Sequence, residues 1–173
     1  MYGQPVDYLV AQGRWIVFAA IGGLLALLGG FVFYASLDNP ELEKAEIELV
    51  GVEVLDVNSI ENRAKLSVTF LVTNPSDVTF TIPQISYSLK ANGVNLGSGE
   101  YSTMDIAMPG RAAFYPDATI ELPNTFSLVY SDRISDQYNA IVSGQPMNYE
   151  AEGMITIESA WSIVEKDFVT KLG

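Results

Sequence analysis

The feature that most constrains this chain is an apolar run over residues 15–37 that contains no charged side chain. Arg14 and Asp38 bracket it. A helix needs about 20 apolar residues to cross the hydrocarbon core of a bilayer, which is about 30 Å thick. The Ile, Leu, Val and Phe residues of the run favour insertion by roughly 4 to 7 kcal/mol in total. The sequence therefore predicts a transmembrane helix over residues 15–37.

Two other interpretations of this run are a cleaved secretory signal and a buried core helix. A signal has an apolar region of about 7–15 residues and a cleavage site with small residues. Here the run is longer, and bulky Phe33 stands where a small residue should precede a site after Ala35. A core helix that is apolar on all faces needs a much larger protein around it. We expect an uncleaved signal anchor.

The flanking charges predict how the helix is oriented. Arg14 lies directly before the run, whereas Asp38 and several glutamates follow it, with Lys44 as the nearest base. Lysine and arginine near a span favour the cytoplasmic side. We therefore expect a single-pass protein of the cell membrane, with residues 1–14 as a short cytoplasmic segment and the remainder outside the cytoplasm.

One face of the predicted helix carries small residues at a spacing of four: Gly22, Ala26 and Gly30. Small residues at this spacing let two helix backbones approach closely. Glycine is also simply common in membrane helices, so the pattern alone does not require a partner. Besides the lipid bilayer, we expect a protein partner that contacts either this helix face or an edge of the domain outside.

The composition excludes several classes of function. The chain has neither cysteine nor histidine, so it has no thiol nucleophile, thiolate metal site, imidazole ligand or Ser-His-Asp triad. Asp7 and Arg14 cancel, which leaves 20 acidic and 8 basic residues after residue 37 and places the whole net charge of −12 there. This charge argues against nucleic-acid binding. We expect no catalytic activity and no cofactor.

Calcium is the best candidate among ligands because it takes oxygen donors alone. Asp56, Asn58 and Glu61 bracket a predicted hairpin at spacings that could converge on an ion. The pattern falls far short of a full calcium-binding loop, and an ordinary polar turn is the competing interpretation. A hydrolase that uses two carboxylates is a further alternative, but no pair of acidic residues is singled out.

Beyond an acidic linker over residues 38–45, the apolar residues alternate with a period of two. Leu66, Val68 and Phe70 share one face of a predicted strand over residues 64–74. Before it, the alternation slips at Val50-Gly51, which predicts a bulge in a long strand that ends at a hairpin over residues 58–62. Such alternation predicts an antiparallel β-sandwich over residues 46–173.

Turn signals divide the rest of the domain. Pro83 interrupts the next strand, over residues 78–91, which should therefore be bent there or lie on a sheet edge. Asn92-Gly93 predicts a type I′ hairpin turn. Helical spacing of apolar residues, followed by Gly144, predicts one short helix over residues 131–143. Further strands are predicted over residues 94–101, 102–108, 112–122 and 149–157.

The middle of the chain resembles the water stress and hypersensitive response (WHy) domain, also known as the LEA-2 or LEA14-like family. The resemblance rests on an Asn-Pro turn, an aromatic strand that ends in Asn-Gly, and a strand of small residues that closes with Gly. Ser76 stands where the family usually has a second asparagine. The motif residues are Asn74, Pro75, Gly93, Gly97 and Gly99.

The resemblance implies an immunoglobulin- or fibronectin III-like sandwich that has no catalytic centre and is linked with stress tolerance. A single-span anchor before such a domain is common in that family. We therefore expect a membrane-anchored β-sandwich with one short helix. We expect it to act through surface interactions in a stress- or envelope-related role. The alternative is an accessory single-span subunit of a larger membrane complex, and a pilin-like filament protein shares the same general layout.

Overall fold

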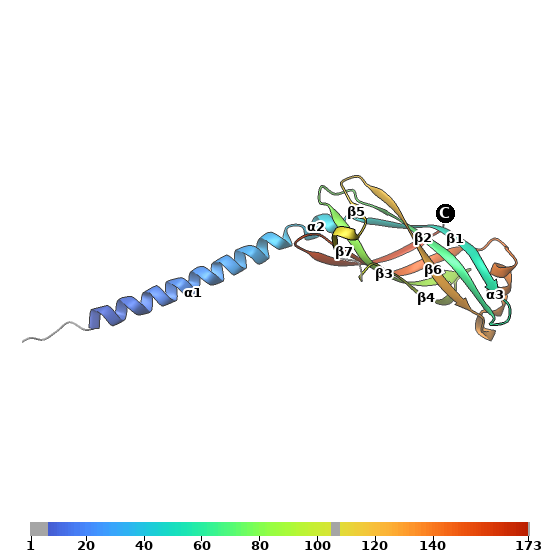
Figure 1. The fold of residues 1–173 in the computed structure, drawn as a ribbon, viewed down its shortest axis with the longest axis horizontal. Helices are drawn as coiled ribbons and strands as arrows, with labels where there is room; N and C mark the ends of the chain where they lie inside the picture. Colours follow the sequence, from blue (N-terminus) through green and yellow to red (C-terminus); the bar gives the residue numbers. More distant parts are fainter. Residues whose placement is uncertain (1–6, 105–107, 173) are drawn as a thin grey trace, which may run out of the picture. The chain divides into compact units, whose positions relative to one another are not determined.

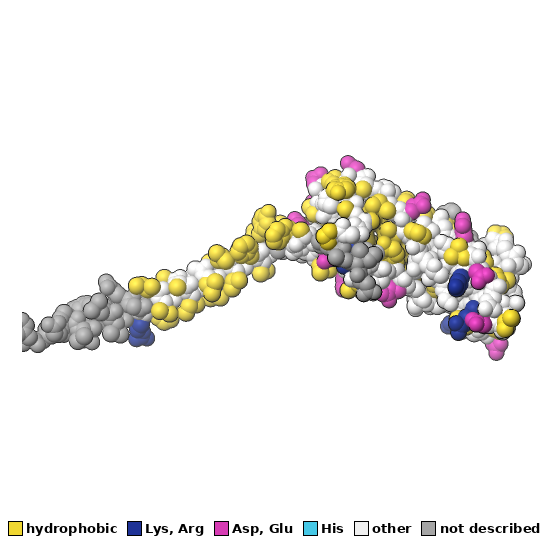
Figure 2. Space-filling model, viewed as in Figure 1, with side chains coloured by type: hydrophobic (Ala, Val, Ile, Leu, Met, Phe, Trp, Pro, Cys, Tyr) yellow, Lys and Arg dark blue, Asp and Glu magenta, His cyan; other side chains and the backbone are white. Residues whose placement is uncertain are grey.

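The computed structural model describes residues 7–104 and 108–172. It divides into two units, Met1–Leu37 and Asp38–Gly173, which we describe separately. The first unit contains helix α1, Asp7–Ser36 (Figure 1). This helix is long and apolar enough to cross a membrane, and its apolar stretch is not buried against other parts of the protein. The helix begins before Trp15, so residues 7–14 continue the same helix. Apolar side chains lie along most of its described length (Figure 2).

The second unit is built from two antiparallel sheets (Figure 1). The smaller sheet has the order β1-β2-β6, and its strands are β1 Glu46–Asn58, β2 Arg63–Thr73 and β6 Thr119–Val129. The larger sheet has the order β4-β3-β7-β8, with β5 paired to β3. Its strands are β3 Phe80–Ala91, β4 Val94–Ser102, β5 Ala113–Phe114, β7 Tyr149–Glu158 and β8 Ile163–Lys171.

A shared apolar core joins the two sheets and confirms the predicted sandwich layout. Every second residue of β2 is buried, from Ala64 to Val72, as the alternation predicts. Phe70 of β2 meets Tyr87 of β3 edge to face, with ring centroids 4.9 Å apart. The same ring lies 5.8 Å from that of Phe168 in β8. Aromatic contacts of this kind fill the space between the sheets.

The hairpin β1–β2 follows the prediction closely. The pairing shifts register between Leu49 and Gly51, which is the predicted bulge, and again between Val54 and Asp56. The turn lies between Asn58 and Arg63. After the first bulge, most of β1 is exposed, whereas Leu66 and Ala64 of β2, which pair with Val54 and Val57, are buried.

Pro83 lies in an interior strand, which contradicts one of the two predictions made for it. β3 lies between β4 and β7, so it is not an edge strand. The other prediction is confirmed, because the register with β7 shifts between Thr81 and Gln84. The missing N–H of Pro83 therefore falls at an irregularity, and its carbonyl accepts a hydrogen bond from Thr103 N–H at 2.8 Å.

Two predicted strands are wrong. The strand expected over residues 102–108 does not continue beyond Ser102, although residues 105–107 lie outside the described part. The strand expected over 112–122 is two strands, β5 and β6, which belong to different sheets. Pro116 and Asp117, with a φ of 61°, turn the chain between them, so it crosses from the larger sheet to the smaller one.

The predicted helix is confirmed, whereas one strand and half of another were missed. A 3₁₀ turn, Asp132–Ile134, leads into α3, Ser135–Val142, and Gly144 follows it with a φ of 71°. Tyr138 and Ile141 of α3 are buried. Sequence reasoning did not find β8 or the second half of β6.

The segment expected to be an acidic linker packs onto the domain. Its residues Asn39–Leu42 form the single helical turn α2. Leu42 and Ala45 are buried in the core. The Nζ group of Lys166 in β8 donates to the carbonyls of Glu43 and Ala45, at 2.8 Å each. Residues 38–45 are therefore held against the larger sheet.

Candidate interaction surfaces

Asn74 forms a buried junction where β2 ends. Its side-chain Nδ2 donates to the carbonyls of Val78 and Phe114, each at 2.9 Å. Its Oδ1 accepts hydrogen bonds from the Ser76 backbone N–H at 3.0 Å and from the Ser76 hydroxyl at 2.7 Å. The Asn74 N–H donates to the Ala118 carbonyl at 2.9 Å. All of these partners are within the domain, so the arrangement stabilises the fold and leaves no group for a ligand.

The other motif residues serve the turn and the packing around Tyr87. Asn92 and Gly93 have φ values of 50° and 80°, as a type I′ turn requires. Pro75 follows Asn74 in the turn after β2, and Gly97 lies in β4 close to the Phe126 ring. A Cβ atom on Gly99 would lie only 2.5 Å from the Tyr87 ring, so this position needs a glycine.

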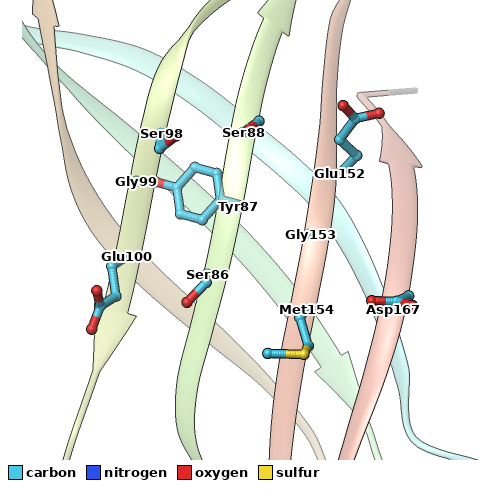
Figure 3. A pocket seen from close by; sticks show the side chains of 10 residues that line it. All are labelled: Ser86, Tyr87, Ser88, Ser98, Gly99, Glu100, Glu152, Gly153, Met154 and Asp167. Atoms are coloured by element: carbon cyan, nitrogen blue, oxygen red, sulfur yellow. The ribbon is translucent and has the colours of Figure 1, made fainter.

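The outer face of the larger sheet has a shallow depression of about 680 Å³ (Figure 3). Its floor consists of small residues of β3 and β4: Ser86, Ser88 and Ser98. Glu100, Glu152 and Asp167 stand around it, and the Tyr87 ring extends toward Gly99. The depression therefore offers a polar surface of serine hydroxyls and carboxylates, and the chain has no histidine to activate the serines.

Ion pairs cross the strands beside this depression. Lys90 Nζ lies 2.6 Å from Glu152 and 3.4 Å from Glu150, which also pairs with Lys171 at 3.3 Å. The hydrogen bond from Lys90 to Glu152 raises the lysine pKa above 10.5. The hydrogen bond from Lys171, followed by that from Lys90, lowers the pKa of Glu150 below 4.5. On the core side, burial raises the pKa of Tyr87, although a hydrogen bond from Asn124 opposes the shift.

The calcium candidates do meet in one place. Asp56, Asn58 and Glu61 line a depression of about 180 Å³, but Arg63 and Lys65 line it too. The Asn58 Oδ1 already accepts backbone N–H bonds from Ile60 and Glu61, at 3.1 Å each. The positive charges of Arg63 and Lys65 beside the acidic side chains oppose the binding of a calcium ion. Among the described residues, no group of three acidic side chains is placed to hold a metal.

Strand β1 presents an apolar surface that sequence reasoning missed. Val54, Leu55 and Val57 are exposed, with 57% of the Leu55 surface accessible, and Ile60 in the following turn is 93% exposed. Among the described strands, β1 pairs only with β2. A free strand edge with apolar side chains is a site where another strand can add. In the sequence, the two adjacent apolar residues Val54 and Leu55 break the alternation, and this break is the signal that could have indicated the surface.

The small residues of α1 lie on the surface of the helix, as do its other described side chains. A Cβ atom on Gly22 or Gly30 would meet nothing within 4 Å. Ala26 is exposed between them. A hollow of about 420 Å³ lies beside Gly30, lined by Leu27, Phe31 and Tyr34. The structure thus places this spacing on one open surface of the helix.

No family model matches the chain, and no curated protein matches it. Several solved structures are similar to it. A protein from Archaeoglobus fulgidus is 16% identical, with a TM-score of 0.45, over 73% of this chain and 94% of that one. A protein from Arabidopsis thaliana is 18% identical, with a TM-score of 0.49, over 73% and 80%. A candidate late embryogenesis abundant (LEA) protein is 19% identical, with a TM-score of 0.43, over 99% and 94%.

Proposed function

We propose that this protein is a membrane-anchored, extracytoplasmic β-sandwich of the LEA14-like, immunoglobulin- or fibronectin III-like kind. It acts without catalysis, by binding a protein partner along strand β1 in a stress- or envelope-related role. The observation that carries this proposal is the apolar, exposed edge of β1, with Val54, Leu55 and Val57 open to solvent. The apolar helix α1 supports the anchoring, and the flanking charges support the orientation.

The mode of binding follows from the geometry of β1. One edge of the strand is hydrogen-bonded to β2. On the other side, Leu49 N–H donates to the Thr170 hydroxyl of β8 at 3.0 Å, so the first part of β1 lies against β8. The exposed apolar side chains of β1 all follow Leu49 in the strand. A partner strand that added beyond Gly51 would gain backbone hydrogen bonds and cover the apolar side chains.

The chemistry of the chain supports the non-catalytic part of the proposal. Without histidine and cysteine, acid–base or nucleophilic chemistry would need carboxylates, lysine, tyrosine or serine. The acidic side chains around the depression on the larger sheet stand on an open surface, where water screens their charge. An enzyme of the carboxylate type would instead need a cleft that raises a carboxyl pKa.

Crosslinking in native membranes tests the binding surface. Leu55→Lys should abolish crosslinks to the partner, because it places a charge in the apolar contact. The matched control is Val169→Lys on β8, which changes an exposed apolar residue outside β1. Crosslinks that survive Leu55→Lys would exclude β1 as the binding edge. Protease digestion of intact cells tests the orientation, and protection of the domain would contradict it.

The hollow beside Gly30 favours a second candidate function, an accessory subunit held in a membrane complex by α1. Sizing in mild detergent tests it: the chain should migrate with a partner, and Gly30→Leu should release it. Gly29→Leu, on a neighbouring face of the helix, should leave the complex intact. Migration of the unaltered chain as a monomer would speak against this candidate.

A further inference from the structure

The tip of the β7–β8 hairpin holds an exposed tryptophan in a fixed position. Trp161 is 68% exposed, and Ile163, two residues later, is 64% exposed. The buried Ser159 hydroxyl accepts hydrogen bonds from the N–H groups of Trp161 at 3.3 Å and Ser162 at 3.1 Å. Ser159 N–H donates to the Ser162 carbonyl at 2.9 Å. A large apolar side chain is thus presented to solvent on a well-bonded turn.

The same turn contacts the residues through which the chain enters the domain. The Ser159 hydroxyl lies 3.5 Å from the Asp38 carboxylate. The Ser162 hydroxyl donates to the Asn39 side-chain oxygen. Helix α1 ends at Ser36, so Asp38 follows it by two residues, which span at most about 7 Å. The hairpin tip is therefore tied to the start of the domain, immediately after the apolar helix.

We propose that Trp161, with Ile163 beside it, inserts into the interfacial region of the bilayer next to the end of α1. The proposal rests on the membrane span put forward above. If α1 crosses the membrane, Asp38 lies at the level of the headgroups, and the hairpin tip lies within reach of them. Tryptophan is enriched at this depth because its ring is apolar and its N–H can still find a polar partner.

The charges around the tip determine which lipid surface fits. The net charge of the residues after 37 is negative, and Asp38, Glu41 and Glu43 lie in the segment that meets the hairpin. Anionic headgroups would be repelled by these groups. The binding is therefore apolar and aromatic, and zwitterionic lipids such as phosphatidylcholine suffice. Insertion would add a second attachment beside α1 and restrict how far the domain can tilt from the membrane.

Fluorescence of the full chain in phosphatidylcholine vesicles tests this insertion. The chain has two tryptophans, so Trp15→Phe leaves Trp161 as the only one. With lipids brominated near the headgroup, we expect its emission to be quenched and, in ordinary vesicles, shifted to shorter wavelength than in the unfolded chain. Ile163→Asp in the same background should reduce the quenching. Emission that is unaffected by bromine and open to aqueous acrylamide would overturn the proposal.

The reciprocal variant separates this proposal from the span itself. In Trp161→Phe, the remaining Trp15 lies at the start of the apolar run and reports on α1. Quenching of Trp15 by brominated lipid, together with resistance to alkaline carbonate extraction, supports the span. If these hold while Trp161 is not quenched, the interfacial insertion is wrong and the span stands. Extraction of the chain by carbonate would overturn both.

Discussion

Asn74 follows β2 and Asn58 ends β1, and each side-chain oxygen accepts a hydrogen bond from the backbone N–H two residues later, at 3.0 and 3.1 Å. The surroundings differ. Asn74 is fully buried, and its Nδ2 also holds the carbonyls of Val78 and Phe114. Asn58 is exposed, and water can replace its bonds. The same local turn therefore stabilises the fold strongly in one place and weakly in the other.

The largest expected effect comes from Asn74→Ala. The substitution removes the bonds to the Val78 and Phe114 carbonyls and the acceptor of the buried Ser76 N–H and hydroxyl, and each unsatisfied buried group costs about 1–3 kcal/mol. We expect the free energy of unfolding to fall by about 3 kcal/mol or more. Urea unfolding of the detergent-solubilised chain measures it.

Asn58→Ala is the matched control for that experiment. Because its turn is exposed, we expect a loss of about 0.5–1 kcal/mol in the free energy of unfolding. If the two variants lost equal stability, the comparison between the buried and the exposed turn would be wrong.

Gly99→Ala extends the comparison to the two faces of one strand. The new methyl group would lie 2.5 Å from the Tyr87 ring, which is buried and bonded to Asn124. Moving this ring should cost about 1–3 kcal/mol of unfolding free energy. Ser98→Ala, on the outer face, should cost little. Thermal unfolding of both variants checks this, and a neutral Gly99→Ala would contradict the close approach.

The ion pairs on the outer face should have a smaller effect that depends on pH. The lowered pKa of Glu150 stabilises the fold above about the ordinary carboxyl value of 4.5, and this contribution is lost as pH falls through the lowered value. The raised pKa of Lys90 likewise stabilises the fold below about pH 10.5, and this contribution is lost as pH rises through the raised value. Unfolding midpoints of Glu150→Gln should therefore vary less with pH on the acid side. If the pH dependence of the unfolding midpoint were unchanged in this variant, Glu150 would not contribute to stability in this way.

The smallest expected effect is that of calcium. Arg63 and Lys65 share the depression with the three candidate ligands, and Asn58 already bonds the turn. We expect no rise in melting temperature when calcium is added to the full chain. Arg63→Gln with Lys65→Gln removes the competing charges and is the variant in which weak binding would first be seen. A clear rise with the unaltered chain would restore the calcium site.

Local patterns predicted those parts of the fold that depend on nearby residues. The alternation in β2, the bulge at Gly51 and the Asn92-Gly93 turn each follow from a few consecutive side chains. The predictions failed where the partner lies far along the chain. Pro83 has the same sequence context at an edge and at an interior irregularity, and only the pairing of β3 with both β4 and β7 distinguishes them.

The candidate surfaces show the same division. Sequence spacing predicted that Asp56, Asn58 and Glu61 would meet, because all three belong to one hairpin. It gave no reason to single out Leu55 or Trp161. Their exposure depends on which strands cover β1 and on which turn meets Asp38, and these are properties of the folded chain.

The sequence by itself determined the long apolar helix, the absence of thiol and imidazole chemistry, the acidic domain and most of the strands, because these depend on composition and short-range periodicity. Only the tertiary structure decided which sheet each strand joins. β5 and β6 are neighbours in the chain yet pair with β3 and β2. Pairing between distant segments also decided which apolar side chains are buried and which stay exposed for binding.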